Sequence, residues 1–318
     1  MALTLSEYAK SLDDRKLIWP QVPAPVPLKS RPSVNKLPNI RVIFWDVYGT
    51  LLRIPDETFT LFPEPEVRLQ VALDKTIHEF NMWNHMYRKP GPPWQSMIHQ
   101  YRDYVDRAKM VAPKHRGDFT EVNLVSIWRS IINRLFDKEY VYDSDTLGNV
   151  SELSEKVAYF FHSCAQGLEG RTDAGYLVNQ LREAGIQQAA LADGQQFTLV
   201  QVARKTLTDD HPSINTLLSP LLNTLSYQYG IRKPSNSLFE IAVEKLDNAG
   251  IPPEQALHVS SRLTDSLVPA KAIGMKTALL AVEKTGLEAA AQFIKDPETR
   301  PDRLLTDLSQ ITEVILGK

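Results

Sequence analysis

The amino-acid sequence predicts an α/β protein with a Rossmann-like parallel sheet as its core and a helical domain inserted into that core. Two patterns carry this prediction. In residues 171–318, short apolar runs alternate with helical segments, which is typical of a parallel sheet with helices on both faces. In residues 55–170, the apolar spacing is helical, which indicates a small helical bundle, a cap over the sheet.

The sequence therefore divides into three parts: an N-terminal arm at 1–38, an α/β core formed by 39–54 and 171–318, and a helical cap domain at 55–170. The arm begins with a short amphipathic patch and then contains six prolines between positions 20 and 38. Proline lacks a backbone donor and restricts the residue before it. We expect an extended arm on the surface or a disordered leader, of which Trp19 and Ile18 indicate a docked part.

The first core strand is predicted over residues 40–45, an apolar and β-branched run that ends at Asp46. Four amphipathic helices are then expected in the cap, because apolar residues recur at intervals of three and four. Their inward stripes are Val67, Val71 and Ile77; Trp94, Ile98, Tyr101 and Val105; Leu124, Ile127, Trp128, Ile131, Ile132 and Leu135; and Val157, Phe160 and Phe161.

The remaining core elements are predicted in chain order after the cap. They are a helix at 172–184, a strand at 186–191, a strand at 224–229, a helix at 235–249, strands at 256–259 and 277–282 on either side of a helix that holds 269–273, and a closing helix at 303–315. Gly185 and Gly250 end the two longer helices, as glycine commonly does.

Composition argues against several classes of partner. The chain has 36 basic and 38 acidic residues, a net charge of −2, which gives no general attraction to nucleic acid or to an anionic membrane. No apolar stretch approaches the roughly 20 residues that span a bilayer, and the N-terminus lacks the pattern of a secretory signal. The single Cys164 favours a reducing compartment, so we expect a cytoplasmic protein, of unspecified oligomeric state.

Residues able to do chemistry follow the predicted strands. In an open α/β sheet, ligands bind beyond the carboxyl ends of the strands, so we expect these residues to form one site. They are Asp46, Tyr48 and Thr50 after the first strand; Ala192 and Asp193 after the second; Lys233 before the helix at 235; and Ser260, Ser261, Arg262 and Asp265 after the strand at 256–259.

These four segments, beginning with Asp46-Val47-Tyr48-Gly49-Thr50-Leu51, resemble the motifs of the haloacid dehalogenase (HAD) superfamily, and the resemblance extends over the core domain from end to end. It implies that Asp46 is a nucleophile that forms a covalent ester with its substrate. Lys233 would keep Asp46 ionised and pair with an anionic substrate. Asp265 would hold Lys233, and Thr50 with the backbone N–H groups of the turn would hydrogen-bond the nucleophile and the substrate.

Tyr48 distinguishes between branches of the superfamily. Phosphatases carry a second aspartate at this position, which protonates the departing alkoxide. A phenol with a pKa of about 10 is a poor proton donor near neutral pH, whereas a halide leaves without a proton. Tyrosine here, and Ser260-Ser261 later, resemble the 2-haloacid dehalogenase branch. The predicted function is thus a hydrolase most like a 2-haloacid dehalogenase, with a small anionic substrate and no required cofactor.

Other positions depart from that branch. Ala192 and Asp193 replace a serine and an asparagine that contact the substrate carboxylate, Arg262 replaces an asparagine, and Phe239 replaces a tyrosine. The halide-binding arginine of the cap cannot be aligned, and its candidates are Arg53, Arg68, Arg88 and Arg102. These differences point to another substrate or to lost activity.

Two alternative functions are retained. One is a Mg²⁺-dependent phosphatase of small phosphorylated metabolites, in which Asp46, Tyr48 and Asp265 would hold the ion. A serine at position 261 weakens that ion site, because Mg²⁺ prefers carboxylate oxygens. The other is a catalytically silent HAD scaffold that binds a metabolite or protein partner through its cap and arm.

Overall fold

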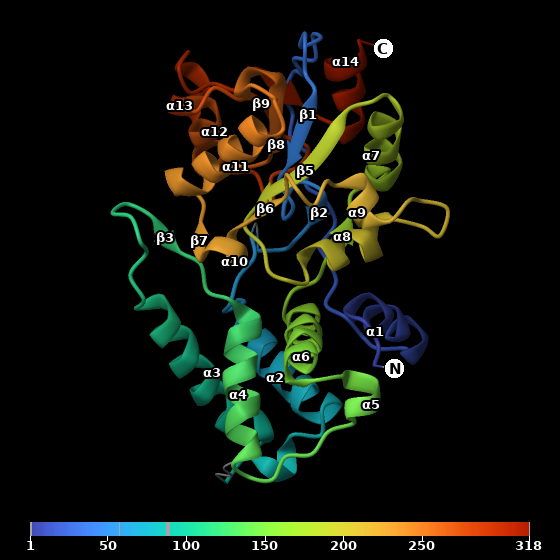
Figure 1. Ribbon diagram of the computed structural model, residues 1–318, viewed down its shortest axis with the longest axis vertical. Helices are drawn as coiled ribbons and strands as arrows, with labels where there is room; N and C mark the ends of the chain where they lie inside the picture. Colours follow the sequence, from blue (N-terminus) through green and yellow to red (C-terminus); the bar gives the residue numbers. More distant parts are fainter. Residues whose placement is uncertain (1, 57, 87–89, 318) are drawn as a thin grey trace.

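The computed structural model describes residues 2–56, 58–86 and 90–317. Within these residues the core is a six-stranded sheet with the order β10-β9-β8-β1-β5-β6, and every neighbouring pair is parallel. Its strands are β1 (Val42–Trp45), β5 (Gln187–Ala192), β6 (Thr224–Leu225), β8 (Ala256–Ser260), β9 (Lys276–Leu280) and β10 (Arg303–Leu305). The predicted α/β fold with a parallel sheet is confirmed, and β1 lies inside the sheet (Figure 1).

The continuous apolar run of β1 is explained by helices on both faces of the sheet. Successive strand side chains point to opposite faces. Ile43 and Trp45 belong to one buried cluster, which also contains Leu177 and Leu181 of α7 (Ala174–Glu183). The side chains of Val42 and Phe44 lie in another, with Leu238, Phe239, Ala242 and Leu246 of α11 (Asn236–Asn248). A strand buried on both faces needs no polar residues, so its sequence does not alternate.

The other core helices are short. They are α8 (Thr198–Thr206), α9 (Ile214–Leu217), α10 (Ser226–Tyr229), α12 (Val268–Ala272), α13 (Ala291–Lys295) and α14 (Ile311–Leu316). Two-stranded pairings outside the main sheet join β2 (Leu52–Arg53) to β4 (Glu169–Gly170) and β3 (Phe119–Thr120) to β7 (Ile231–Arg232).

The inserted segment is helical, as predicted. Its helices are α2 (Val67–Glu79), α3 (Pro93–Lys109), α4 (Leu124–Phe136), α5 (Ser144–Leu147) and α6 (Val150–Ala165), which lie together at the end of the molecule away from the sheet (Figure 1). Tyr101, Trp128 and Phe161 from α3, α4 and α6 meet at ring-centroid distances of 5.1–6.3 Å. Trp128 is therefore a core residue of the cap.

Three element predictions are wrong. The stripe of α2 consists of Leu69, Ala72, Leu73, Thr76 and Ile77, whereas Val67 and Val71 are exposed. The strand predicted at 224–229 ends after Leu225, where the sheet ends, and α10 follows. The closing helix begins only at Ile311, because residues 303–305 form the edge strand β10. Small or polar residues inside a stripe and a three-residue edge strand both give weak periodic signals.

The N-terminal arm is more ordered than predicted. Residues 5–11 form α1 (Leu5–Ser11), whose first turn is closed by a reciprocal capping box between Thr4 and Glu7. Tyr8 and Leu12 are buried in the cluster that fills the cap. Beyond α1 the arm contains no helix from 17 to 37, and Trp19 docks with its ring 5.7 Å from that of Phe160. Ile18 does not dock, since it is 82% exposed.

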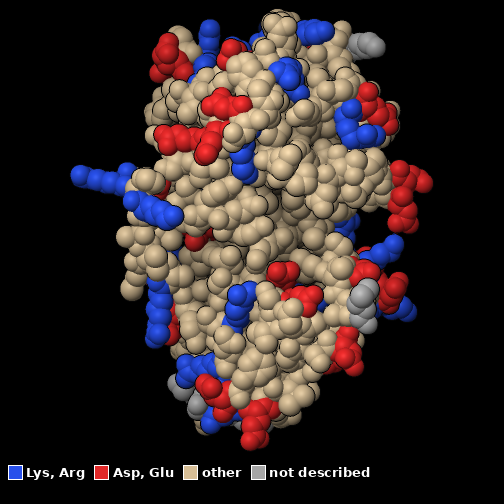
Figure 2. All heavy atoms as spheres, viewed as in Figure 1, with Lys and Arg blue, Asp and Glu red and all other residues tan. Residues whose placement is uncertain are grey.

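The surface carries both signs of charge. Acidic and basic side chains both occur around the edge of the face in Figure 2, and a broad central area carries few charges. In the described part of the chain, no helix is long and apolar enough to cross a membrane.

Candidate active site

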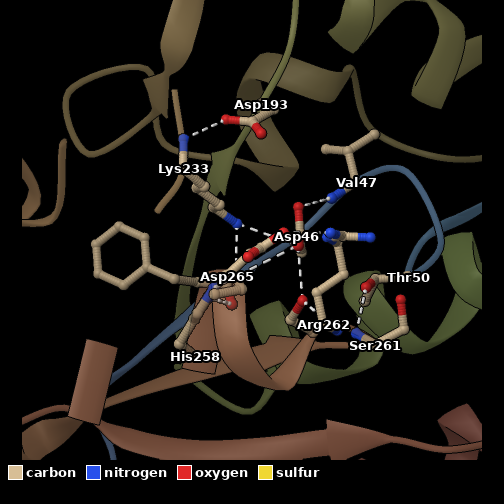
Figure 3. A network of polar contacts seen from close by, with 12 residues as sticks. Asp46, Val47, Thr50, Asp193, Lys233, His258, Ser261, Arg262 and Asp265 are labelled. Carbon is tan, nitrogen blue, oxygen red and sulfur yellow. Dashed lines mark hydrogen bonds and ion pairs between the residues drawn. The ribbon is translucent and has the colours of Figure 1, made fainter. Parts of the chain in front are cut away.

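Asp46 lies at the carboxyl end of β1, where its backbone N–H donates to the carbonyl of Val259 in β8 at 2.9 Å. Its side chain is almost completely buried. The carboxylate oxygen Oδ1 accepts the N–H of Val47 at 2.9 Å, and Oδ2 accepts the hydroxyl of Ser260 at 2.6 Å (Figure 3). The predicted nucleophile is thus held in one orientation by its own loop and by the end of β8.

Lys233 lies beside this carboxylate, as predicted. Its Nζ is 3.1 Å from Oδ2 of Asp46 and donates to Oγ of Ser266 at 2.7 Å. Ser266 in turn contacts Nε2 of His258 at 2.7 Å, and Nδ1 of His258 lies 3.0 Å from the carbonyl of Phe44. Burial, together with Lys233, lowers the pKa of His258 to about 3, so this histidine is neutral. It accepts from Ser266 and orients it.

The charge of Asp46 depends on these neighbours. Burial raises the pKa of the Asp46 carboxyl, but the Lys233 ammonium and the Ser260 hydroxyl outweigh it, and the pKa lies below its ordinary value. Two opposite charges that are both buried stabilise each other only when their remaining hydrogen bonds are satisfied. Here Ser260, Ser266 and Val47 provide those bonds, so Asp46 is an ionised carboxylate.

The turn after Asp46 is fixed by Thr50 and by an arginine that the sequence analysis missed. Oγ1 of Thr50 accepts the N–H of Ser261 at 3.1 Å. Arg171 donates to the carbonyls of Gly49 and Thr50 at 2.7 and 2.8 Å, and it pairs with Glu283. Arg171 stands alone in the sequence, outside the four motif segments, so no pattern singles it out.

Asp265 does not hold Lys233, contrary to prediction. Its carboxylate pairs with the guanidinium of Arg262, and Ser266 takes the predicted place beside the lysine. The backbone N–H of Arg262 donates to Oγ of Ser260 at 3.0 Å, which aligns that hydroxyl with Asp46. Arg262 and Asp265 therefore form a charge pair of their own next to the site (Figure 3).

Tyr48 is placed differently from the prediction. It is 3% exposed, and its hydroxyl lies 2.7 Å from Oε1 of Gln201 and 3.0 Å from Oγ1 of Thr198, both on α8. Burial raises the pKa of the phenol. Its hydroxyl is thus engaged with α8 and is not presented to a ligand at Asp46.

The predicted magnesium ligands do not fit a Mg²⁺ ion. The ion prefers several oxygen ligands, carboxylates among them. Oδ2 of Asp46 is paired with Lys233, Asp265 is paired with Arg262, and the Tyr48 hydroxyl is bonded to α8. Across residues 2–56, 58–86 and 90–317, no three His, Cys, Asp or Glu side chains gather in a metal-binding arrangement.

Ala192 and Asp193 end β5 in different surroundings. Ala192 is fully buried in the core cluster, and its methyl side chain has no hydrogen-bonding group. Oδ1 of Asp193 accepts the backbone N–H of Lys233 at 2.9 Å. Burial raises the pKa of Asp193 to about 6, opposed by Lys233 and reinforced by Asp46.

A cavity of about 390 Å³ lies between the cap and the core. Asp193 is the predicted site residue that lines it; Asp46 does not. Glu121, which the sequence analysis missed, also lines it, and burial and the nearby Asp193 raise its pKa to about 7. Lys109 and Arg232 line the cavity with their exposed side chains, and 58–62 and 118–122 supply most of the remaining wall.

The candidate halide-binding arginines are engaged elsewhere. Arg53 pairs with Glu283 at 2.9 Å, Arg68 with Asp56 at 2.6 Å and Arg102 with Glu66 at 2.6 Å. None of these three lines the cavity. The fourth candidate, Arg88, lies outside the described residues.

The chain is therefore an α/β protein with an inserted helical cap, and its buried carboxylate–lysine pair lies at the edge of the parallel sheet where such proteins bind ligands. The sequence comparison gives the family. Residues 40–273 match the profile of haloacid dehalogenase-like hydrolases. Because this match spans most of the chain, the protein belongs to that family.

Solved structures similar to this chain include two 2-haloacid dehalogenases and the protein CbbY. The 2-haloacid dehalogenase of Pseudomonas syringae pv. Tomato DC3000 has 16% identity and a TM-score of 0.51, with 86% of this chain and 97% of that chain covered. L-2-haloacid dehalogenase of Xanthobacter autotrophicus has 16% identity, a TM-score of 0.42 and coverages of 86% and 96%. CbbY of Rhodobacter sphaeroides, solved with xylulose-(1,5)bisphosphate, has 17% identity, a TM-score of 0.42 and coverages of 85% and 95%. Comparison with curated protein sequences found no match.

Proposed function

We propose that this HAD-family hydrolase uses Asp46 as a nucleophile and forms a covalent ester with its substrate. One observation carries the proposal: the carboxylate of Asp46 is ionised and lies 3.1 Å from the ammonium of Lys233, at the ligand-binding edge of the sheet. Lys233 and Ser260 hold Oδ2, so we assign the attack to Oδ1.

The reaction has two steps. Oδ1 attacks the carbon that bears the leaving group, a C–O bond forms, and the leaving group departs as an anion with the bonding electrons. Water then adds to the ester carbonyl of Asp46, the alcohol product leaves, and a proton is released. One oxygen of the regenerated carboxylate then comes from water. Because the leaving group takes no proton, the reaction does not need an acid at position 48.

The favoured substrate is a small anion, as for a 2-haloacid dehalogenase. Lys233 supplies the positive charge that attracts it. Asp193 opposes it when ionised, and a pKa of about 6 means that this repulsion is weakest in mildly acidic solution. The two effects together favour an anion whose charge lies closer to Lys233 than to Asp193.

The two alternatives are less well supported. A Mg²⁺-dependent phosphatase needs an ion site and a general acid, and the predicted ligands do not fit the ion, while the hydroxyl of Tyr48 is engaged by Gln201. A silent binding scaffold does not account for an ionised carboxylate maintained beside a buried ammonium. Keeping such a pair buried costs desolvation energy that an apolar pair would not.

The test is mass spectrometry of the protein after turnover in H₂¹⁸O with 2-chloropropionate, together with chloride release in metal-free buffer. We expect ¹⁸O in Asp46 and a loss of roughly 10³-fold or more in chloride release for Asp46→Asn. Asp103→Asn, an exposed carboxylate on α3, is the control and should keep full activity.

Other outcomes separate the alternatives. Mg²⁺-dependent hydrolysis of p-nitrophenyl phosphate, abolished by Asp46→Asn, would replace the dehalogenase proposal with the phosphatase. Absence of turnover with both substrate classes, and no ¹⁸O in Asp46, would leave the silent scaffold.

A further inference from the structure

A chain of buried hydrogen bonds runs from the loop of Asp46 to the cap. The hydroxyl of Tyr48 donates to Oε1 of Gln201 at 2.7 Å, and Nε2 of Gln201 donates to Nδ1 of His162 at 2.9 Å. Nε2 of His162 donates to Oε1 of Gln166 at 2.9 Å. Nε2 of Gln166 donates to Oδ2 of Asp56 at 2.7 Å. These hydrogen bonds thus pass from the core loop through α8 to α6 and to the turn at Asp56, which leads into the cap.

Each atom in this chain has one consistent role. Tyr48 donates to Gln201, so the hydroxyl of Thr198 donates to Tyr48, and Thr198 accepts the N–H of Gln195 at 2.7 Å. His162 accepts at Nδ1 and donates at Nε2, which requires a neutral ring. Burial lowers the pKa of His162 to about 4, so the ring is neutral at pH 7.

Two residues of the cavity wall, Phe59 and Thr60, contact this hydrogen-bond chain. Phe59 lines the cavity and stacks on His162, with 4.5 Å between ring centroids and 19° between planes. Phe59 also contacts Tyr48 at 5.6 Å. The backbone N–H of Thr60, another cavity residue, donates to Oε1 of Gln166 at 3.0 Å. A displacement of Tyr48, His162 or Gln166 would therefore shift the cavity wall at Phe59 and Thr60.

Asp46 is nearly completely buried, so a substrate reaches it only after surrounding segments of the protein move. The buried polar chain crosses from core to cap at the bond between Gln201 of α8 and His162 of α6. Breaking it leaves buried donors and acceptors unpaired, which is costly in a low-dielectric interior. The closed arrangement is therefore held by polar contacts whose geometry is specific.

We propose that Tyr48, Gln201, His162 and Gln166 form a latch that holds the cap closed and couples its closure to the loop of Asp46. Gln201 is the positioning residue at its centre, since it bonds both the core loop and the cap helix. The role of the latch in catalysis rests on the proposed function, whereas its role in holding the cap closed does not. Tyr48 has a structural task here in place of proton transfer.

The test compares three proteins by amide hydrogen exchange without substrate: the unmodified chain, Gln201→Met and Gln201→Glu. Methionine keeps the size of the side chain and removes both hydrogen bonds. We expect at least 10-fold faster exchange at the amides of 58–62 and 47–52 in Gln201→Met. Gln292→Met, at an exposed position on α13, is the matched control and should exchange at the unmodified rate.

Gln201→Glu distinguishes a latch from simple packing. A glutamate accepts from Tyr48 and from His162 once Nδ1 of His162 is protonated, so the chain is restored with one extra proton. We expect exchange close to that of the unmodified protein, and a His162 pKa, measured by NMR, raised by two or more units. The latch is refuted if the amides of 58–62 and 47–52 in Gln201→Met exchange at the unmodified rate. It is also refuted if these amides exchange as fast in Gln201→Glu as in Gln201→Met and the pKa of His162 does not rise.

These measurements need no substrate, so the latch and the nucleophile are tested separately. If Asp46 takes up no ¹⁸O while the hydrogen-exchange results are as expected, the proposed function is refuted and the latch is not. Where turnover is found, we expect Gln201→Met to change KM and kcat together, since both entry and closure depend on the latch.

Discussion

The residues around Asp46 show how two buried carboxylates acquire opposite pKa shifts: the pKa of Asp46 is lowered and that of Asp193 is raised. Asp46 has the ammonium of Lys233 at 3.1 Å and the hydroxyl of Ser260 at 2.6 Å. Lys233 contacts Asp193 through its backbone N–H, at 2.9 Å, and not through its ammonium group. The ammonium therefore acts mainly on Asp46, and burial dominates the pKa of Asp193, which is about 6.

Asp193 gives a prediction for stability. Its folded pKa of about 6 lies above the ordinary value of 3.8. A raised carboxyl pKa contributes stability below pH 3.8, and this contribution is lost as pH rises through 6. Asp193→Asn should therefore raise the free energy of unfolding at pH 7 by roughly 1–3 kcal/mol.

Urea denaturation at pH 7 and at pH 3.5 measures this effect. The difference between Asp193→Asn and the unmodified protein should disappear at the lower pH, where both side chains are neutral. Equal stabilities at pH 7 would mean that Asp193 is not buried as the structure has it.

At the scale of elements, the helix α6 joins the cap to the rest of the molecule. It packs against α1, α2 and α4 and carries His162, the cap side of the latch. Its N-terminus is closed by a reciprocal capping box in which Asn149 accepts the N–H of Glu152, and Glu152 accepts the N–H of Asn149. This cap satisfies donors that the first turn of a helix leaves free.

Asn149→Ala should lower the free energy of unfolding by about 1 kcal/mol, because it removes the side-chain half of the capping box. Chemical denaturation followed by circular dichroism measures the loss. Asn149→Asp keeps an acceptor at the same position and should be close to the unmodified protein. Equal losses for both substitutions would show that capping does not account for the effect.

Prediction of elements succeeded where the periodic signal was strong. Leu124 to Leu135 repeat at three and four positions, and α4 buries all six predicted residues. The helix α8, which carries Thr198 and Gln201, was not predicted. Among its residues Thr198, Gln201 and Val202 are buried, so two of its three inward positions are polar. Their burial is stabilised by hydrogen bonds to Tyr48 and His162, which no local pattern reveals.

At the scale of the whole molecule, the N-terminal arm connects the cap to the core. Tyr8 and Leu12 are buried in the cap cluster, while Pro27 forms a backbone bridge to Glu283. The carboxylate of Glu283 pairs with Arg171, whose guanidinium bonds the turn after Asp46. The arm thus contributes to the surroundings of the site although it lies outside the four motif segments.

The docking of the arm is tested by substitution of Leu12, which is fully buried. Leu12→Ala should lower the free energy of unfolding by about 3 kcal/mol, through lost burial and the cavity left behind. Ile18→Ala, at a residue that is 82% exposed, should change it by less than about 0.5 kcal/mol. A small effect at Leu12 would show that α1 does not pack on the cap in solution.

The sequence by itself determined the parallel α/β core, the helical insertion and the adjacency of Asp46 and Lys233. Periodicity and the order of polar residues after buried strands are local properties, and parallel strands bring their carboxyl ends to one edge. Only the tertiary structure decided the partners of the polar side chains. It paired Asp265 with Arg262, bonded Tyr48 to Gln201, and brought Glu121 and Arg171 near the site. Apart from the Arg262–Asp265 pair, those contacts join segments far apart in the chain, and the local spacing of residues does not specify which distant polar groups meet.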